Sequence, residues 1–335
     1  MRKAIYAYDI KKEDAIRVNT NFLISDTISK FIQSNMSWKF GKHYYINILP
    51  NIKANCYMNC VIQCLARIPA LTHLLLDSNF FKNIDPHSFL SQYISLLKLM
   101  TTKKETLTTM SNQAKVLADR RLELCPEFFP NSHNDAQEFL SFLLTKFSEE
   151  CPNFGHVQHH LFSIYKDNCQ YCNEAVHKSI RRSVDHSLML EMIISEDSLL
   201  TTMIKNSMKE KELFSEERWR CPECYEKNTR SFQSSTFFKL PNVLVVQLKR
   251  CQRFNGRLRK DNTAVDYERY MTLTEGTDTT VNYELIGLVI FSGKGVDVGH
   301  YYCYILHSTN QWYCIDDLIL EKGAPSPATT VTAVT

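Results

Sequence analysis

The stretch NCYMNCVIQCLARIP, residues 55–69, places three cysteines at a regular four-residue spacing. On an α-helix this spacing brings Cys56, Cys60 and Cys64 onto one face, one turn apart. Residues stacked on a single helix cannot surround an ion, so the three cysteines are a poor metal site by themselves. The stripe therefore predicts either a packed helix face or a face on which one cysteine is chemically active.

The position on the helix separates the three cysteines. Cys56 lies where the loop LPNIKAN gives way to the helical pattern, and Asn55 before it is interpreted as the helix cap. The unpaired N–H groups and positive dipole end of a helix N-terminus stabilise a thiolate. Cys60 and Cys64 lie too far inside the helix for this effect, and we expect them to pack as small hydrophobic residues. Cys56 is the predicted nucleophile.

Composition limits the setting in which this nucleophile acts. The chain has 335 residues with 44% hydrophobic content, which is enough for one large core or two modest ones. A net charge of +3 predicts no broad cationic face for nucleic acid, and no segment approaches the ~20 apolar residues of a membrane span. The N-terminus lacks the apolar stretch of a signal peptide. We therefore expect a cytoplasmic or nuclear protein whose twelve cysteines are thiols or metal ligands.

The spacing of apolar residues along the chain changes near its middle. Helical spacing of apolar residues runs from residue 55 to about 76, with a second helix starting at Pro69, and continues between residues 86 and 122. The segment SHNDAQEFLSFLLTKF, residues 132–147, begins with a capping cluster and predicts another helix. After Cys151, short β-prone runs predict a mainly antiparallel sheet.

Two Cys-x-x-Cys pairs predict a zinc site. Each pair has the spacing with which two thiolates hold one Zn²⁺, and two such pairs complete a tetrahedron with no open position. The interpretation is one structural Zn²⁺ in a ribbon; the alternative is four unrelated buried cysteines. A zinc ribbon also leaves nucleic-acid binding open as a remote alternative, although no interleaving of aromatic residues and arginine supports it. The HVQHH run, residues 156–160, is interpreted as a solvated turn. The four predicted ligands are Cys169, Cys172, Cys221 and Cys224.

A thiol nucleophile needs a general base and a group that orients the base. In GKGVDVGHYYCYILHSTNQWYCIDD, His300 opens one β-prone run, and a second run ends at Asp316. If the two runs pair as a hairpin around the HSTNQ turn, these two side chains lie at the same end of the hairpin. The sequence therefore permits a Cys-His-Asp triad of Cys56, His300 and Asp316.

These motifs together resemble the catalytic domain of the ubiquitin-specific protease family. LPNIKANCYMNCVIQCL resembles the cysteine box of that family, SHNDAQEFLSFLL its acidic-glutamine box, and the cysteine pairs its zinc-binding fingers. KLPNVLVVQLKR and YELIGLVIFSGKGVDVGHYYCY with QWYCIDD are similar to its palm and histidine-box segments. The resemblance implies an α+β, papain-like cysteine protease fold with a helical thumb, an antiparallel β palm and zinc-ribbon β fingers.

The resemblance also implies an activity and roles for residues. It implies a thiol protease that hydrolyses the isopeptide or peptide bond after the C-terminal glycine of ubiquitin, acting on ubiquitin and ubiquitinated proteins as a monomer or a subunit of a larger complex. Asn51, five residues before the nucleophile, would stabilise the oxyanion. The basic tail of ubiquitin would meet Asp135, Gln137 and Glu138, for which helix capping is the alternative.

The resemblance divides the chain into an N-terminal extension of unknown role, residues 1–48, and a catalytic domain, 49–318. The polar composition of the chain end predicts a disordered tail, 319–335. Within the domain we expect the thumb at about 49–150, the fingers at about 155–238 and the palm at about 239–318.

The chain also departs from the family pattern. Lys53 stands where the family has glycine, Phe291 where it has histidine, and Cys251 where it has an aromatic residue. The short Thr-, Ala- and Pro-rich end leaves the palm without a final strand. A ubiquitin-binding protein of low or no activity is therefore the alternative to an active enzyme.

Overall fold

The structure is a computed structural model of the whole chain. It describes residues 26–35, 45–77, 80–81, 84–128, 134–172, 180–195, 199–214, 221, 230–254, 257–293, 298–325 and 331–334.

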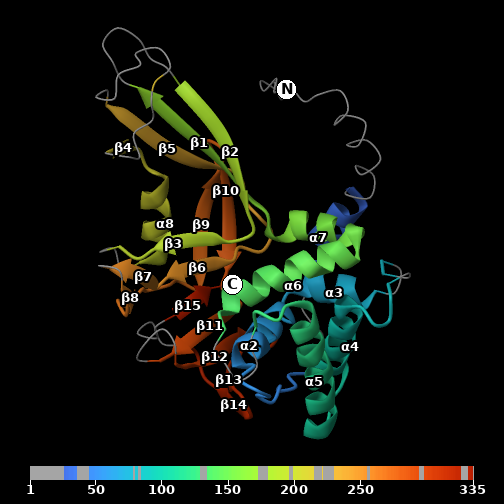
Figure 1. Cartoon of the computed structure of the whole chain (residues 1–335). Coiled ribbons are helices and arrows are strands. Elements are labelled where there is room, and N and C mark those ends of the chain that lie inside the picture. The colour runs from blue at the N-terminus through green and yellow to red at the C-terminus, as the bar shows by residue number, and fades with distance from the viewer. Residues whose placement is uncertain are drawn as a thin grey trace.

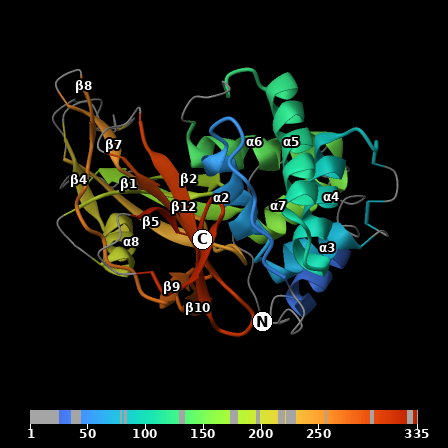
Figure 2. The ribbon, with the colours of Figure 1, turned by 90° about the horizontal axis from the view of Figure 1, so that it is seen from below.

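Helices form one side of the molecule and strands the other, which is clearest from below (Figure 2). The predicted tandem helices at 55–76 are confirmed, because Pro69 opens the second of them at its first turn, where a missing N–H costs nothing. The predicted helix at 132–147 is confirmed as well, and Asp135 caps it by accepting from two backbone N–H groups. The helical side consists of residues 26–35, α2 (Cys56–Leu65), α3 (Pro69–Leu76), α4 (Phe89–Thr102), α5 (Leu107–Leu124), α6 (Ala136–Glu150) and α7 (Pro152–Phe162).

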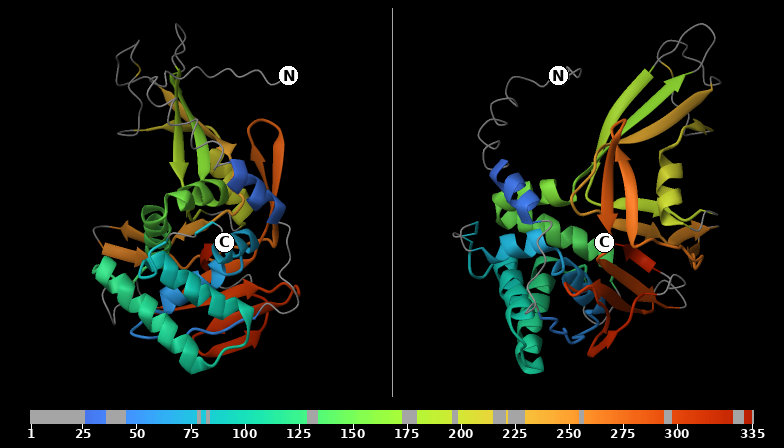
Figure 3. Two further views of the ribbon diagram at one scale, coloured as in Figure 1. Left: turned by 90° about the vertical axis from the view of Figure 1, so that its right-hand side faces the viewer. Right: turned by 180° about the vertical axis from the view of Figure 1, so that it is seen from behind.

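A first sheet, called the finger sheet here, projects from the body of the molecule (Figures 1 and 3). Neighbouring strands are in the order β10-β9-β5-β1-β2, and β4 pairs with β5. Their bounds are β1 (Ile164–Cys172), β2 (Ile180–Ser187), β4 (Lys211–Leu213), β5 (Ser231–Lys239), β9 (Tyr270–Glu275) and β10 (Thr279–Glu284).

A second sheet, called the palm sheet here, packs against the helices. Its strand order is β14-β13-β12-β11-β15-β6-β3, antiparallel except for the parallel pair β3–β6. A separate hairpin joins β7 (Cys251–Phe254) to β8 (Arg257–Lys260), and α8 (Leu200–Met208) packs on the strand side. The palm strands are β3 (Leu190–Ile193), β6 (Val246–Lys249), β11 (Gly287–Ser292), β12 (His300–Leu306), β13 (Trp312–Asp316), β14 (Ile319–Lys322) and β15 (Val331–Val334).

The prediction of a disordered tail at residues 319–335 is wrong for the part of this segment that the structure describes. Residues 319–322 form β14 on the edge of the palm, and residues 331–334 form β15 between β11 and β6. β15 therefore supplies the strand that we expected the palm to lack. The β-branched residues of the TTVTAVT end suit a sheet, and pairing with two neighbours outweighs the low hydrophobicity of the segment.

The borders between fingers and palm also differ from those expected. Residues 152–162, expected mainly in the fingers, form the helix α7, and β3, within the same range, belongs to the palm sheet. The hairpin β9–β10, expected in the palm, joins the finger sheet through β5. Order along the chain does not determine sheet membership, because pairing partners far apart in sequence decide it.

One hydrophobic core runs from the thumb helices into the palm. All ten residues of α2 are buried, and the core around them includes residues of every helix from the segment 26–35 to α7 and of β11, β12 and β13. A second core fills the opposite face of the palm sheet, between β6, β11, α8 and β9. The helix α2 is thus the central element on which thumb and palm meet.

No single described helix is long and apolar enough to cross a membrane. The pair α2 and α3 reaches the required length and apolarity only together, across a bend of 91°.

The HVQHH run is not a solvated turn, as its sequence suggested, but the end of α7. His159 is half-buried there, with its Nδ1 2.9 Å from the Tyr165 hydroxyl and its Nε2 3.4 Å from the Lys239 ammonium. Burial, followed by the positive charge of Lys239, lowers the pKa of His159 to about 4. Further positive charge acts in the same direction from His160, His186 and His156.

Acid is expected to destabilise the fold through His159. The unfolded chain takes up a proton on this residue near pH 6.5, and the folded chain only near 4. Between these values the unfolded state binds more protons, so stability falls as the pH falls. The loss of Tm between pH 6.5 and 4 should be smaller in His159→Gln than in the parent protein. The exposed residue His87 supplies the control, His87→Gln. Equal losses in both variants would contradict the assignment.

Candidate active site

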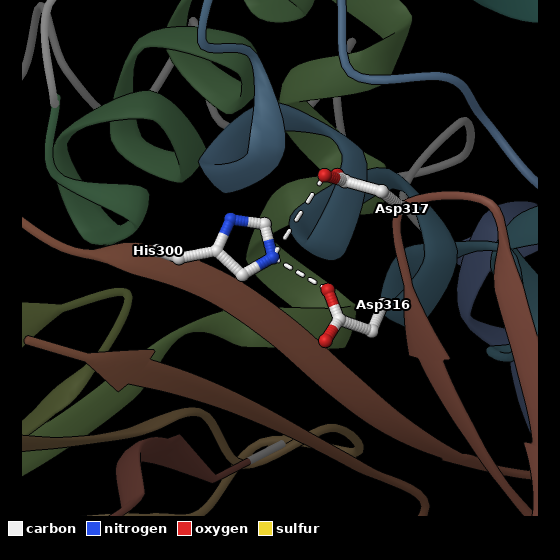
Figure 4. A group of neighbouring side chains, drawn as sticks. All are labelled: His300, Asp316 and Asp317. Carbon is white, nitrogen blue, oxygen red and sulfur yellow. Dashed lines mark hydrogen bonds and ion pairs between the residues drawn. The ribbon is translucent and has the colours of Figure 1, made fainter.

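A histidine and a carboxylate meet at one end of the palm hairpin, as the sequence predicted. β12 and β13 pair antiparallel with Cys303 opposite Ile315, and the turn between them includes Asn310 at φ +64°. The hairpin brings His300 Nε2 within 2.6 Å of Asp316 Oδ1. The other ring nitrogen, Nδ1, points away from both neighbouring carboxylates (Figure 4). Asp316 thus holds one imidazole nitrogen and leaves the other available.

A second carboxylate lies beside this pair. Asp317 Oδ2 is 3.9 Å from His300 Nε2 and accepts a hydrogen bond of 3.2 Å from Asn51 Nδ2. Asp317 has a φ of +50°, a left-handed conformation that aspartate tolerates better than most residues. His300, Asp316 and Asp317 are also the one group among the described residues with metal-ligand geometry. The short contact from Nε2 to Asp316 identifies the group as a histidine oriented by a carboxylate.

Cys56 is the first residue of α2 and lies against the start of β12. Its side chain lines a small pocket together with Tyr301, Cys303 and Asp317. The Tyr301 backbone hydrogen-bonds the Cys56 sulfur. Tyr301 directly follows His300 in β12, and the Asp316 and Asp317 carboxylates both act on the Cys56 thiol, so the thiol lies in the same part of the molecule as the His300–Asp316 pair. The structure therefore gathers Cys56, His300 and Asp316 in one region.

The surroundings of Cys56 favour the protonated thiol. Burial raises its pKa, since the residue is only 3% exposed, and the Asp317 carboxylate raises the pKa further. The Tyr301 backbone hydrogen bond opposes both effects. The thiol pKa nevertheless stays above its ordinary value, so the N-terminus of α2 alone does not ionise the sulfur. A base that removes the proton is needed.

Two further side chains of α2, which the sequence analysis did not single out, position the loop before Cys56. Asn59 Nδ2 donates to the carbonyls of Leu49 and Pro50, and Gln63 Nε2 donates to the carbonyl of Asn47. Asn59 and Gln63 form a buried stripe with a four-residue spacing, one position before Cys60 and Cys64. The same periodicity that revealed the cysteines was therefore the signal for these anchors.

Asn55 occupies the N-cap position of α2, but the expected capping interaction is absent. Its side chain accepts no hydrogen bond from the helix, and its Oδ1 is buried without a partner among the described residues. The backbone explains the difference, since Asn55 has φ −87° and ψ 13° instead of the extended conformation that turns a cap side chain toward the N–H groups.

The remaining cysteines of the stripe pack in the core, as predicted. Cys60 and Cys64 are buried, and each makes a thiol hydrogen bond with Cys303 of β12. Burial raises the pKa of Cys60, which keeps it a neutral thiol. The stripe therefore serves mainly to attach α2 to the palm.

The N-terminus of α6 lies near the same cleft. The Ala136 backbone hydrogen-bonds the Tyr301 hydroxyl, and Gln137 Oε1 accepts a 2.8 Å bond from Gln247 Nε2 of β6. Asp135 Oδ1 caps the helix, which supports the structural alternative for this residue. Glu138 is an exposed residue, although part of its carboxyl group is shielded from solvent. This partial burial, followed by the negative charges of Asp135 and Glu127, raises the pKa of the carboxyl group.

The predicted zinc ligands are not gathered by the described residues. Cys169 and Cys172 both lie in β1, in a regular register with β5, and residues three apart in a strand point to opposite faces. Cys172 and Cys221 are fully buried, whereas Cys169 is half-buried. No three of the described cysteines come within metal-binding distance of one another, and Cys224 lies outside the described residues. The described residues therefore do not by themselves form a four-thiolate site.

The backbone before Cys56 has a left-handed conformation at two consecutive residues that are not glycine. Lys53 has a φ of +55° and Ala54 a φ of +61°. Lys53 is the position at which the resembling family has glycine, which adopts this conformation without steric cost. The Lys53 ammonium lies 3.9 Å from Asp119 of α5, and both side chains are about half exposed. The lysine charge is therefore directed toward α5.

The helical thumb with its cysteine and the β palm with its histidine and aspartate form the fold of the ubiquitin-specific proteases, a papain-like α+β fold. A family model described as ubiquitin carboxyl-terminal hydrolase matches residues 49–332. The chain belongs to the ubiquitin carboxyl-terminal hydrolase family.

Relatives of the chain are considerably longer. Ubiquitin carboxyl-terminal hydrolase 42 of Homo sapiens is 24% identical over 296 residues, which is 82% of this chain and 21% of the human protein. Ubiquitin carboxyl-terminal hydrolase 25 of Arabidopsis thaliana is 30% identical over 136 residues, 38% of this chain and 20% of the plant protein. The chain thus spans about a fifth of the length of these relatives.

Solved structures share the fold. The SAGA DUB module Ubp8/Sgf11/Sus1/Sgf73 bound to monoubiquitin contains a chain that matches with a TM-score of 0.76 and 21% identity, covering 86% of this chain and 68% of that one. The same module bound to ubiquitin aldehyde matches with a TM-score of 0.75 and 20% identity, covering 95% and 75%. At this identity the likeness is one of fold.

Replacing Lys53 by glycine is expected to stabilise the protein slightly. The left-handed conformation costs a residue with a side chain about 1–2 kcal/mol, and glycine loses about half to one kcal/mol of this gain to chain entropy. Lys53→Gly should therefore raise the free energy of unfolding by up to about 1 kcal/mol, measured by urea denaturation. The control Lys53→Gln keeps the backbone cost and removes only an exposed ion pair, so it should be near neutral. A destabilised Lys53→Gly would contradict the backbone explanation.

Proposed function

We propose that this chain is a deubiquitinating cysteine protease that hydrolyses the bond after the C-terminal glycine of ubiquitin. The single observation that carries the proposal is the His300–Asp316 pair at 2.6 Å beside the buried Cys56. Membership of the ubiquitin carboxyl-terminal hydrolase family and the fold shared with ubiquitin-bound modules support ubiquitin as the substrate.

The geometry suggests a mechanism in which His300 moves the proton. Its Nδ1 removes the proton of the Cys56 thiol, and the sulfur attacks the carbonyl carbon of the terminal glycine. The imidazolium, stabilised by Asp316, then gives the proton to the leaving amine. A water molecule, deprotonated by the same imidazole, hydrolyses the resulting thioester. Because the raised pKa favours the protonated thiol, the sulfur becomes nucleophilic only when a base accepts its proton.

Asn51 is the proposed donor to the oxyanion. An asparagine amide carries two N–H groups. One is bound to Asp317, and the other remains to donate to the negatively charged oxygen that forms during attack. Asp317 would thus orient Asn51 as Asp316 orients His300.

The acidic start of α6 is the proposed site for the basic tail of ubiquitin. Glu138 is exposed there, and Asp135 keeps its second carboxylate oxygen after capping the helix. Gln137 is held by Gln247, which fixes this end of α6 to β6. A cationic tail would compensate the negative charge of the two carboxylates. Partial burial and the nearby Asp135 raise the pKa of Glu138, so its ionised form would gain from such a partner.

A catalytically impaired ubiquitin-binding protein is the second candidate. The observation that favours it is the left-handed backbone at Lys53, because it strains the loop that carries Asn51. We further propose that the protein resides in a reducing compartment, the cytoplasm or nucleus. It acts there either alone or as a subunit of a larger complex. The reducing compartment rests on the cysteine-rich composition, and the complex on the likeness to a multisubunit module.

A ubiquitin probe with an electrophilic C-terminus separates the two candidates. The parent protein should form a covalent adduct of the combined mass, because the Cys56 sulfur attacks the probe, and Cys56→Ser should form none. Cys251→Ser is the matched control, since that cysteine is exposed and belongs to β7, outside α2. Mass spectrometry reads out both reactions. Binding of the probe without an adduct would overturn the enzyme proposal and support the impaired candidate.

The structural zinc ion remains a proposal that rests on the spacing of the two Cys-x-x-Cys pairs. Purified protein should contain about one Zn²⁺ per chain, the content of a single four-thiolate site. Elemental analysis of the parent protein and of Cys172→Ser, alongside Cys314→Ser as a control cysteine of the palm, measures it. A parent protein without zinc, with the thiols of Cys169, Cys172, Cys221 and Cys224 all free to react, would remove the site.

A further inference from the structure

The turn and edge strand that follow the catalytic aspartates expose three consecutive apolar residues. Leu318 is 52% exposed, Ile319 53% and Leu320 40%. They directly follow Asp317, which lies 3.9 Å from His300. All four residues of β14 are exposed, so neither hydrophobic core covers this strand. An apolar surface thus begins within two residues of the proposed catalytic pair.

The strand β14 also leaves one backbone edge unpaired within the described part of the chain. β14 pairs with β13 on one side and ends the palm sheet on the other. Ile319 and Leu320 are successive strand residues, so their side chains point to opposite faces of the sheet. A partner that contacts both must therefore cover the edge, as an added extended strand does. The apolar part of this edge is confined to Leu318, Ile319 and Leu320, because the rest of the strand is Glu321 and Lys322.

The position of β14 indicates which part of a substrate would reach it. The start of α6, where we place the ubiquitin tail, is attached to β6, and β6 lies on the opposite side of β12 and β13 from β14 in the sheet. The finger sheet lies at one end of the molecule and β14 at the other, with β12 and β13 between them (Figure 1). A ubiquitin whose tail meets the start of α6 therefore leaves the amine side of the scissile bond to the β14 end.

We propose that β14 and the preceding Leu318 form a docking surface for the protein from which ubiquitin is removed, and that this protein presents an extended apolar segment near its modified lysine. The inference rests on the proposed deubiquitinating activity and adds the surface that selects the leaving group. Apolar contact at this edge would hold the leaving protein while the bond beside it is cut, which lowers KM for protein conjugates.

Two substrates with the same ubiquitin part test the proposal. One is ubiquitin with a C-terminal aminocoumarin, whose leaving group has no protein segment that could pair with β14. The other is a pool of polyubiquitinated proteins, from which released ubiquitin is measured. The variant is Ile319→Ser with Leu320→Ser, which leaves the exposed turn and both aspartates in place. The matched control is Ile193→Ser, because Ile193 is 67% exposed on β3, the other edge of the same sheet.

The double variant should lose at least about tenfold more kcat/KM on the protein conjugates than on the coumarin substrate, the change produced by losing one buried apolar contact. The loss should be a higher KM, and Ile193→Ser should resemble the parent on both substrates. Equal losses on both substrates, or no loss on either, would overturn the docking surface. If the parent protein cleaves neither substrate, the proposed function itself fails, which is a different outcome.

Discussion

The burial of α2 on all sides is the constraint on which the site depends. Its ten residues have no exposed face, so the helix cannot shift without opening the core between thumb and palm. The cysteine stripe packs on β12 through Cys303, and the amide stripe holds the segment before the helix. With both faces attached, the N-terminal end of α2 has one position, and Cys56 lies there beside the histidine strand.

A cost follows from placing the nucleophile in such a helix. The same burial that positions Cys56 raises the pKa of its thiol, and the nearby Asp317 adds to the effect. The helix N-terminus would favour a thiolate, but in this arrangement desolvation is the larger influence. The site thus holds a neutral thiol and an oriented imidazole. The proton transfer proposed for His300 therefore has to offset the effect of this burial on the thiol pKa.

Local pattern was sufficient to predict much of this site. The four-residue stride identified α2, the capping cluster at Asp135 identified the start of α6, and the turn between two β-prone runs brought His300 to Asp316. Each of these features depends on contacts within one helix or one hairpin. The spacing of apolar residues and the residues of the connecting turns are sufficient to predict such contacts.

The features that the sequence did not predict depend on pairing between distant segments. β15 joins β11 and β6 across many intervening residues, and β9 and β10 join the fingers instead of the palm. The regular pairing of β1 with β5 separates Cys169 from Cys172, although their spacing suggests a shared ion. Periodicity reports which residues are apolar, but not which strand becomes the neighbour.

Left-handed residues that are not glycine occur on both sides of the candidate active site. Lys53 and Ala54 precede α2, and Asp317 follows β13. Asn51, two residues before Lys53, donates from its side-chain amide to the Asp317 carboxylate, so the two left-handed segments are in contact. Such conformations cost about 1–2 kcal/mol per residue, whereas each large apolar side chain buried in α2 contributes about 1.5–3 kcal/mol. The stabilisation from burying the helix is therefore larger than the conformational cost of the left-handed residues before it. A core of this stability tolerates a strained loop. The loop can therefore keep the conformation that the site requires, even where its residues disfavour that conformation.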